Sequence, residues 1–316
     1  MQTKSTGKKR RRLLWAALPV AIVIIFFGLN ALLQTFWAHR DPYFFPDYAQ
    51  IDLSPIPEQD SLAEEDYETI FFQTGLAQPA VDALLSQGSQ GVEQILETQA
   101  GFFAEQTPVC LDLPPITKED RLRDADGNPV YSVPLAPLEP GDIILSFSTH
   151  TYGWRHGHAS LVVDPQLGIT LEAVVLGSDS AQVNAQHWRT YSNFMVLRVK
   201  DADDETRQQV VQFALEHLDG IPYSLLSGIF GPKAPDPDSD LKAQCAYLPW
   251  YAWKAFGVDL DSDGGKIVTV LDLAESPLLE VVQIYGIDPA FYLYNIKHRA
   301  PGSPSRALCV SFEGDI

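Results

Sequence analysis

The chain has 316 residues, of which 46% are hydrophobic and 20% are charged, and its formal net charge at pH 7 is −19. This balance suits a globular protein of one or two domains with a sizeable core. The acidic excess repels nucleic acid and anionic lipid headgroups, so we expect no nucleic acid among the partners.

The first 40 residues differ from the rest of the chain. A basic cluster from Lys4 to Arg12 precedes an uncharged stretch from Leu13 to Ala38. The apolar part of this stretch is close to the ~20 residues that a membrane-spanning helix needs. The positive charges before it predict a cytoplasmic N-terminus, so residues 1–40 are expected to be a single-pass anchor in the cell membrane. A cleaved signal peptide is the alternative, but no small-x-small cleavage site follows the stretch.

All 41 acidic residues and 15 of the 22 basic residues follow Arg40, so the expected extracytoplasmic part has a net charge of −26. That part carries three cysteines, an odd number for an exported protein. Cys110 and Cys309 could form a disulfide and leave Cys245 free, or they could be two buried thiols. In either case Cys245 is the expected free thiol.

Residues 41–135 are expected to form a spacer and a small helical lead-in. The segment 41–57 is rich in Pro and Asp, which indicates an extended spacer. Three helices are predicted after it, over residues 61–75, 79–87 and 91–106. Their apolar faces need a surface to cover, so we expect the lead-in to lie on the main domain.

Local signals support these boundaries. Ser61 and Glu64 have the spacing of a capping box, and Pro79 stands in the first turn of the second helix. The stretch that follows the helices, residues 121–142, is expected to be a loop with a hairpin turn at Asp126 and Gly127.

The character of the chain changes at about residue 136. Four short β-branched segments bounded by turn residues predict antiparallel strands, over residues 142–148, 158–163, 169–175 and 194–199. An amphipathic helix over residues 203–220 follows, with acidic residues in its first turn. The predicted fold class is therefore α+β with an antiparallel sheet in residues 136–290, and residues 291–316 form a C-terminal extension.

Cys245 precedes an aromatic run that contains Pro249. A proline is costly in a helix interior but is accepted in the first turn, so this helix is expected to begin at about Ala246. Cys245 then lies at a helix N-terminus, where unpaired N–H groups and the helix dipole favour a thiolate. A buried, unreactive cysteine is the alternative.

A predicted hairpin supplies a base for this thiol. A turn near residues 165–168 places His158 opposite Glu172 or its neighbour. Glu172 would then orient the imidazole while the other ring nitrogen faces the thiol, as in covalent catalysis. A solvated edge position is the alternative for Glu172. His156, His158 and Cys245 lack the spacing of a zinc motif, so no metal and no cofactor are expected.

The order of these segments resembles the YiiX-like, circularly permuted NlpC-type papain-fold cysteine hydrolases, to which proteins related to lecithin–retinol acyltransferase are similar. The resemblance rests on "PGDIILSFS", "GHASLVV", "LEAVV", "VLRV", "GIPYS" and "QCAYLPWYAWKAFGVDL", and it covers about residues 138–288. In this group the histidine precedes the cysteine, as it does here. The implied fold is a permuted papain-like domain with a nucleophile helix, preceded by the transmembrane helix and the helical lead-in.

The resemblance also implies roles for single residues. Cys245 would be the nucleophile, His158 the base and Glu172 the third member of the triad. Tyr223 and Gln244 are candidates for the cleft or the oxyanion hole, which the backbone N–H of Cys245 would help to form. Many relatives have a serine after the cysteine, where this chain has an alanine.

The predicted function is therefore a membrane-anchored, extracytoplasmic cysteine hydrolase that cleaves an amide or ester bond in a peptide or acyl substrate of the cell envelope. A non-catalytic envelope-binding module and a lipid acyltransferase are the alternatives. A calcium-stabilised protein is a weaker one. Asp259, Asp261 and Asp263 begin like a calcium loop, but Val270 stands where the bidentate glutamate should be.

Overall fold

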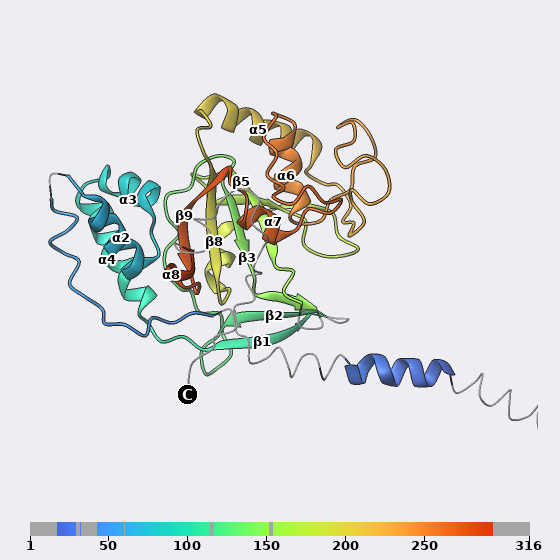
Figure 1. Ribbon diagram of the computed structural model, residues 1–316, viewed down its shortest axis with the longest axis horizontal. Helices are drawn as coiled ribbons and strands as arrows, with labels where there is room; N and C mark the ends of the chain where they lie inside the picture. Colours follow the sequence, from blue (N-terminus) through green and yellow to red (C-terminus); the bar gives the residue numbers. More distant parts are fainter. Residues whose placement is uncertain are drawn as a thin grey trace, which may run out of the picture.

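The computed structural model describes residues 18–29, 32, 43–59, 61–113, 117–151 and 154–292. A six-stranded sheet with the strand order β7-β6-β5-β3-β8-β9 forms its centre (Figure 1). All neighbouring strands in it are antiparallel. The strands are β3 (Ile143–Ser146), β5 (His158–Asp164), β6 (Ile169–Glu172), β7 (Ala181–Asn184), β8 (Phe194–Val199) and β9 (Leu279–Tyr285). The predicted α+β class with an antiparallel sheet is confirmed.

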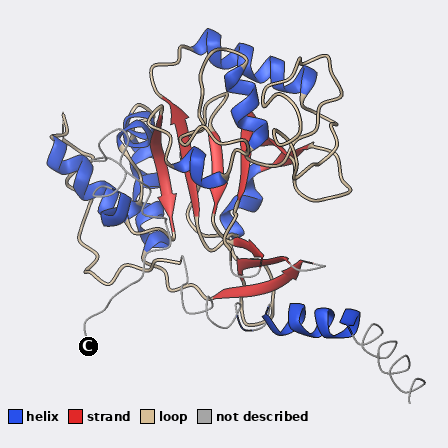
Figure 2. Cartoon of the chain, turned by 45° about the vertical axis from the view of Figure 1, so that its right-hand side comes forward, coloured by secondary structure: helices blue, strands red, loops and turns tan. Residues whose placement is uncertain are grey.

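Helices cover both faces of this sheet (Figure 2). Strand alternation sends Ile143 and Leu145 to the face that is covered by α5 (Asp204–His217) and α6 (Tyr247–Lys254). Ile144, between them, joins the core on the opposite face. Residues that are apolar on both sides of a strand are typical of a sheet buried between two layers.

The lead-in covers that opposite face with three helices. They are α2 (Glu64–Thr74), α3 (Gln78–Leu85) and α4 (Ser89–Phe102), close to the predicted ranges. Their side chains and those of the sheet form one core cluster, so the predicted packing of the lead-in on the main domain is confirmed. The predicted capping box of Ser61 and Glu64 is wrong. Ala63 is the N-cap of α2, and its N–H donates to the carboxylate of Asp66 at 2.9 Å.

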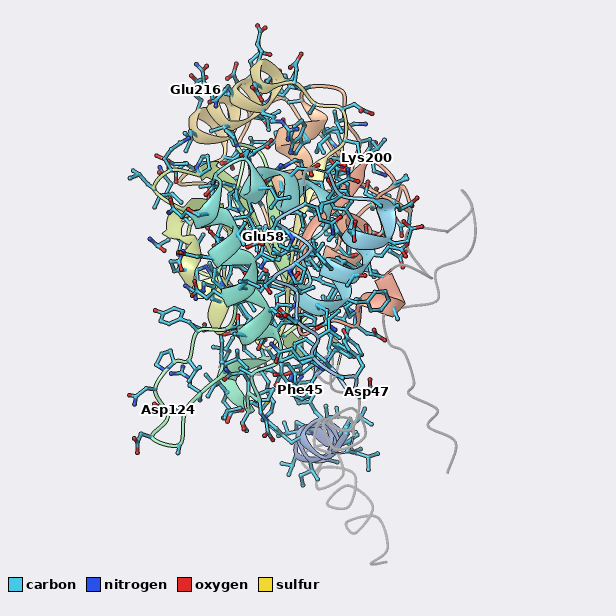
Figure 3. All side chains as sticks on the ribbon, turned by 90° about the vertical axis from the view of Figure 1, so that its left-hand side faces the viewer. Phe45, Asp47, Glu58, Asp124, Lys200 and Glu216 are labelled. Carbon is cyan, nitrogen blue, oxygen red and sulfur yellow. The ribbon has the colours of Figure 1, made fainter. Side chains whose placement is uncertain are left out.

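A second, three-stranded sheet lies beside the main one and was not predicted. It has the order β1-β2-β4, with β1 (Pro108–Leu113), β2 (Thr117–Leu122) and β4 (Thr149–Thr151). The predicted turn at Asp126 and Gly127 follows it, where the N–H of Gly127 donates to the carbonyl of Asp124 at 3.0 Å. Asp124 lies on a loop that projects from the body of the molecule (Figure 3).

The expected transmembrane helix is not supported. No helix in the described part of the chain combines the length and the apolar character that crossing a bilayer requires. The structure describes residues 18–29 of this region as helix. The rest of the predicted stretch, the basic cluster before it and residues 293–316 lie outside the described residues. The extracytoplasmic location stays a prediction.

A buried ion pair joins β8 to the residue that precedes β3. The guanidinium of Arg198 donates to both carboxylate oxygens of Asp142, at 2.9 and 2.7 Å, and to Glu139 at 2.6 Å. Asp142 is fully buried, and burial raises the pKa of its carboxyl above the ordinary value although Arg198 opposes this. A charge in this position depends on its partner.

Arg198→Ala should therefore lower the free energy of unfolding by ~3–5 kcal/mol, because it leaves a buried carboxyl without its cation. Urea denaturation measures the change. The matched control is Lys254→Ala, which removes an exposed pair with Asp259 and should cost ~0–1 kcal/mol. Equal losses in the two variants would contradict the importance assigned to the buried pair.

Candidate active site

His158 is fixed by the backbone that precedes it. Gly157 has a φ of 70°, and a Cβ at this position would lie 2.3 Å from the carbonyl oxygen of Ser146. Only glycine permits this close approach of β3 and β5 without strain. His158, the first residue of β5 and the register partner of Ser146, is 5% exposed. Its imidazole is thus held inside the molecule at the edge of a strand.

Glu172 is the centre of a dense hydrogen-bond network. Its side chain is 1% exposed, and its Oε2 lies 2.7 Å from Nε2 of His158. Since a carboxylate can only accept, this imidazole nitrogen is the donor. The other oxygen, Oε1, accepts from three groups: Thr170 Oγ1 at 2.6 Å, His187 Nε2 at 2.8 Å and Trp188 Nε1 at 3.1 Å. Four donors on one carboxylate replace the water that burial removes.

The hairpin register differs slightly from the predicted one. Leu161 pairs with Leu171, and a bulge follows Val162. His158 is therefore a diagonal neighbour of Glu172 on the same face of the sheet instead of its direct partner. Diagonal neighbours are still within reach of long side chains, which explains why the contact forms despite the shift.

Cys245 lies where the proline indicated. Helix α6 begins at Tyr247 with Ala246 as its N-cap, and Pro249 occupies the first turn. Cys245 directly precedes the cap and is 9% exposed. Its backbone N–H makes no backbone hydrogen bond to another described residue.

Gln244 holds this turn in shape. Its Oε1 accepts from the backbone N–H of Ala246 at 2.8 Å and lies 3.5 Å from the Cys245 sulfur, while its Nε2 donates to the carbonyl of Val268. Gln244 was a candidate for the oxyanion hole. The structure uses its side chain to connect the nucleophile turn to the segment before α7 (Val270–Ala274).

Cys245 acts on the imidazole of His158, because it is among the groups that raise the pKa of this ring. Nε2 is bonded to Glu172, so Nδ1 is the ring nitrogen that remains for another partner. Burial disfavours the charge on His158, but hydrogen bonds and charge from Cys245 and Glu172 outweigh it and raise the pKa of His158 to about 10. Burial raises the pKa of Glu172, but the hydrogen bonds from His158 and His187 outweigh it and lower this pKa far below the ordinary value. Both groups are therefore charged at neutral pH.

Trp188 fixes the plane of the imidazole. Its ring is fully buried and stacks on His158 at a centroid distance of 5.2 Å and an angle of 7°. It belongs to the 3₁₀ helix η1 (Ala185–Thr190), which returns the chain to Glu172 after β7. Thr170 and Glu172 are two residues apart on one strand and therefore lie on the same face. This spacing could have predicted that Thr170 contacts Glu172.

Tyr223 lies beside the nucleophile. Its backbone forms a bridge with Ala243, two residues before Cys245, and burial together with the charge of Cys245 raises the pKa of its hydroxyl well above the ordinary value. The phenol is therefore a neutral donor at physiological pH. The expected role of Tyr223 at a cleft stays a prediction.

Two other sequence candidates lie outside this network. His156 bonds to Thr151 at 3.0 Å and to its neighbour's carbonyl, and it does not contact Cys245. The ammonium of Lys233 lies in the Asp-rich turn, where it donates to Asp261 and to the carbonyl of Gly265. Carboxylate oxygens of Asp261, Asp263 and Asp272 also lie within 4.8 Å of one another.

Comparison with known proteins adds one likeness. The chain is similar to a solved structure titled "Crystal structure of metalloprotein yiiX from Escherichia coli O157:H7, DUF1105", with 16% identity and a TM-score of 0.36, over 46% of this chain and 97% of that chain. No family model matches the chain, and no curated protein matches it. The NlpC-type papain assignment expected from the motifs receives no support from these comparisons. A likeness at this TM-score assigns no role to any residue, so the roles are argued from geometry.

Glu172→Gln should destabilise the protein by ~1–3 kcal/mol, because an amide has one acceptor oxygen for four donors. The lost contribution depends on pH. Because the pKa of Glu172 is lowered, the stability that the ionised pair contributes is fully present above pH 4.5. Because the pKa of His158 is raised, the same contribution is fully present below pH 6.5 and is lost as the pH rises through about 10.

Urea unfolding of both proteins at several pH values measures the difference. It should be largest between pH 4.5 and 6.5 and should shrink toward about pH 10. Glu216→Gln, an exposed change on α5, is the matched control and should have little effect at any pH. A difference that grows toward pH 10 would contradict the charged pair.

Proposed function

We propose that the chain is a cysteine hydrolase that cleaves an amide or ester bond. Cys245 is the nucleophile, His158 carries the proton and Glu172 orients the imidazole. One observation carries the proposal: Nε2 of His158 is bonded to the buried carboxylate of Glu172, and Cys245 helps to raise the pKa of the same imidazole. This is the sequence of nucleophile, base and orienting group that covalent catalysis requires.

The reaction proceeds in two halves. The sulfur of Cys245, whose proton has passed to His158, attacks the carbonyl carbon, and the backbone N–H of Cys245 donates to the oxygen that becomes negative. His158 then gives its proton to the leaving nitrogen or oxygen, and a thioester remains on the sulfur. Water attacks the thioester, loses a proton to His158 and releases the acid, and Cys245 regains its starting state.

The surroundings of the thiol favour a substrate with an apolar acyl group. The N–H of Tyr223 donates to the carbonyl of Ser178 at 3.0 Å and thereby joins two loops beside the site. These loops expose what we name the apolar rim, five side chains that are each more than half exposed: Val174, Val175, Leu176, Leu225 and Leu226. Contiguous exposed apolar side chains mark binding surfaces more often than chance.

Two alternatives remain distinct in their outcomes. An acyltransferase would form the same thioester and pass the acyl group to an acceptor other than water. A non-catalytic binding module would keep the apolar rim but would not need an ionised sulfur. The reactivity of Cys245 therefore separates the module from the two enzymes.

Iodoacetamide should alkylate Cys245 ~10-fold or more faster than Cys110 at neutral pH, although Cys110 is exposed and Cys245 is buried. Partial desolvation of its sulfur and the nearby charge of Asp120 raise the pKa of Cys110 to about 11, so it stays protonated. Peptide mass spectrometry of chelator-treated protein separates the two sites.

His158→Ala should slow the labelling of Cys245 and leave that of Cys110 unchanged. His217→Ala, a half-buried histidine on α5 outside the network, is the matched control. Labelling of Cys245 that is no faster than that of Cys110, or that is indifferent to His158→Ala, would exclude the enzymatic proposal and favour the binding module.

A further inference from the structure

A second group of reactive side chains lies on the small sheet. Cys110 on β1 and Asp120 on β2 are register partners, and His150 on β4 is the partner of Lys118, two residues along β2 from Asp120. Strand alternation thus places all of them on one face. The ligand atoms of Cys110, Asp120 and His150 lie within 4.8 Å of one another.

The geometry of this group differs from that of the candidate active site. Nε2 of His150 lies 3.8 Å from the Cys110 sulfur and 3.7 Å from Oδ1 of Asp120, so the thiol and the carboxylate face the same ring nitrogen. At His158 the carboxylate of Glu172 takes Nε2 and leaves Nδ1 for a second group, as proton transfer through an imidazole requires. The other nitrogen of His150, Nδ1, is buried and has no partner in the described structure. Ligand atoms that converge on one ring nitrogen are arranged as in a coordination site and not as in a proton relay.

We propose that Cys110, Asp120 and His150 bind a divalent transition-metal ion, and that zinc fits their donor set best. Thiolate, imidazole and carboxylate are the three ligand types that zinc takes in proteins. Tetrahedral bonds of ~2.3 Å to sulfur and ~2.0–2.2 Å to nitrogen and oxygen put the ligand atoms ~3.3–3.6 Å apart. The two separations from Nε2 of His150, 3.8 Å to the sulfur and 3.7 Å to the carboxylate, need to close by only a few tenths of an ångström.

The neighbouring charges leave room for the ion. Arg155 donates to Oδ2 of Asp120 at 2.7 Å, which orients the carboxylate and turns Oδ1 toward His150. Lys118 pairs with Asp112 at 2.8 Å, and this contact draws its charge toward the neighbouring strand. The two anionic ligands, Cys110 as thiolate and Asp120, then match the charge of a dication.

The exposure of the three ligands defines the rest of the coordination sphere. Asp120 and His150 are buried, whereas Cys110 is exposed, so the ion reaches the site from solvent and its fourth position is open to water. A metal on Nε2 leaves the ring proton on the unpartnered Nδ1. Because an outer hydrogen bond at this position is worth ~10–100-fold in affinity, we expect binding weaker than that of a site that has one.

Cobalt titration of the full chain tests this site, after treatment with reductant and chelator. We expect one equivalent of Co²⁺ to produce the near-ultraviolet charge-transfer band of a thiolate ligand, and zinc to displace it. Cys110→Ser should abolish the band, and His150→Ala should weaken binding by ~10-fold or more. Cys245→Ser is the matched control and should leave the band unchanged.

The same wild-type protein offers a readout that does not depend on folding of a variant. Zinc should slow the alkylation of Cys110 and leave that of Cys245 unaltered. Absence of the band and of this protection would overturn the proposal. A band or protection that follows Cys245 would also overturn it, because the metal would then belong to the candidate active site. Neither result bears on whether Cys245 acts as a nucleophile without metal.

Discussion

The buried carboxylate of Glu172 is the constraint on which the site depends. A charge with 1% of its side chain exposed is tolerable only where hydrogen bonds and an opposite charge replace water. Strand β6 contributes Thr170, η1 contributes His187 and Trp188, and β5 contributes His158. Each of these elements supplies a donor to the carboxylate. The bond to Glu172 restrains rotation of the His158 imidazole and raises its pKa.

The central sheet brings the thiol to this fixed imidazole. Helix α6 packs on β5, the strand that carries His158, and its N-terminal turn presents Cys245. Gln244 and Gly157 hold the two sides of the contact, one through side-chain hydrogen bonds and the other through a backbone conformation that excludes a Cβ. Neither residue takes part in the proposed chemistry, but each fixes the backbone next to one of the two side chains. A rigid sheet and a capped helix are suited to hold such geometry.

The parts of the site that could be predicted from sequence are those with local signals. The hairpin between β5 and β6 relates His158 to Glu172, and the tolerance of a first turn for Pro249 locates the start of α6.

Trp188 was not assigned to the site, because its role depends on β7 pairing with β6 and on the return of η1 to Glu172. Cys110, Asp120 and His150 could not be grouped either. Their contact needs β2 to pair with β4, although residues 123–148, which include β3, separate the two strands in the chain. In addition, β1 and β2 lack a strong β-strand pattern. The apolar N-terminal stretch indicated a membrane span from its composition, whereas no helix among the described residues is long and apolar enough to cross a bilayer.

The charge state of His158 tests the account most directly. Nitrogen-15 NMR of histidine-labelled protein reports the protonation of each ring nitrogen as the pH is raised. The account predicts that the His158 ring keeps both protons until about pH 10, with Nε2 hydrogen-bonded throughout, and that Cys245→Ser lowers this midpoint. A midpoint near the ordinary value of 6.5 that is the same in Cys245→Ser would contradict the pairing of imidazole and sulfur.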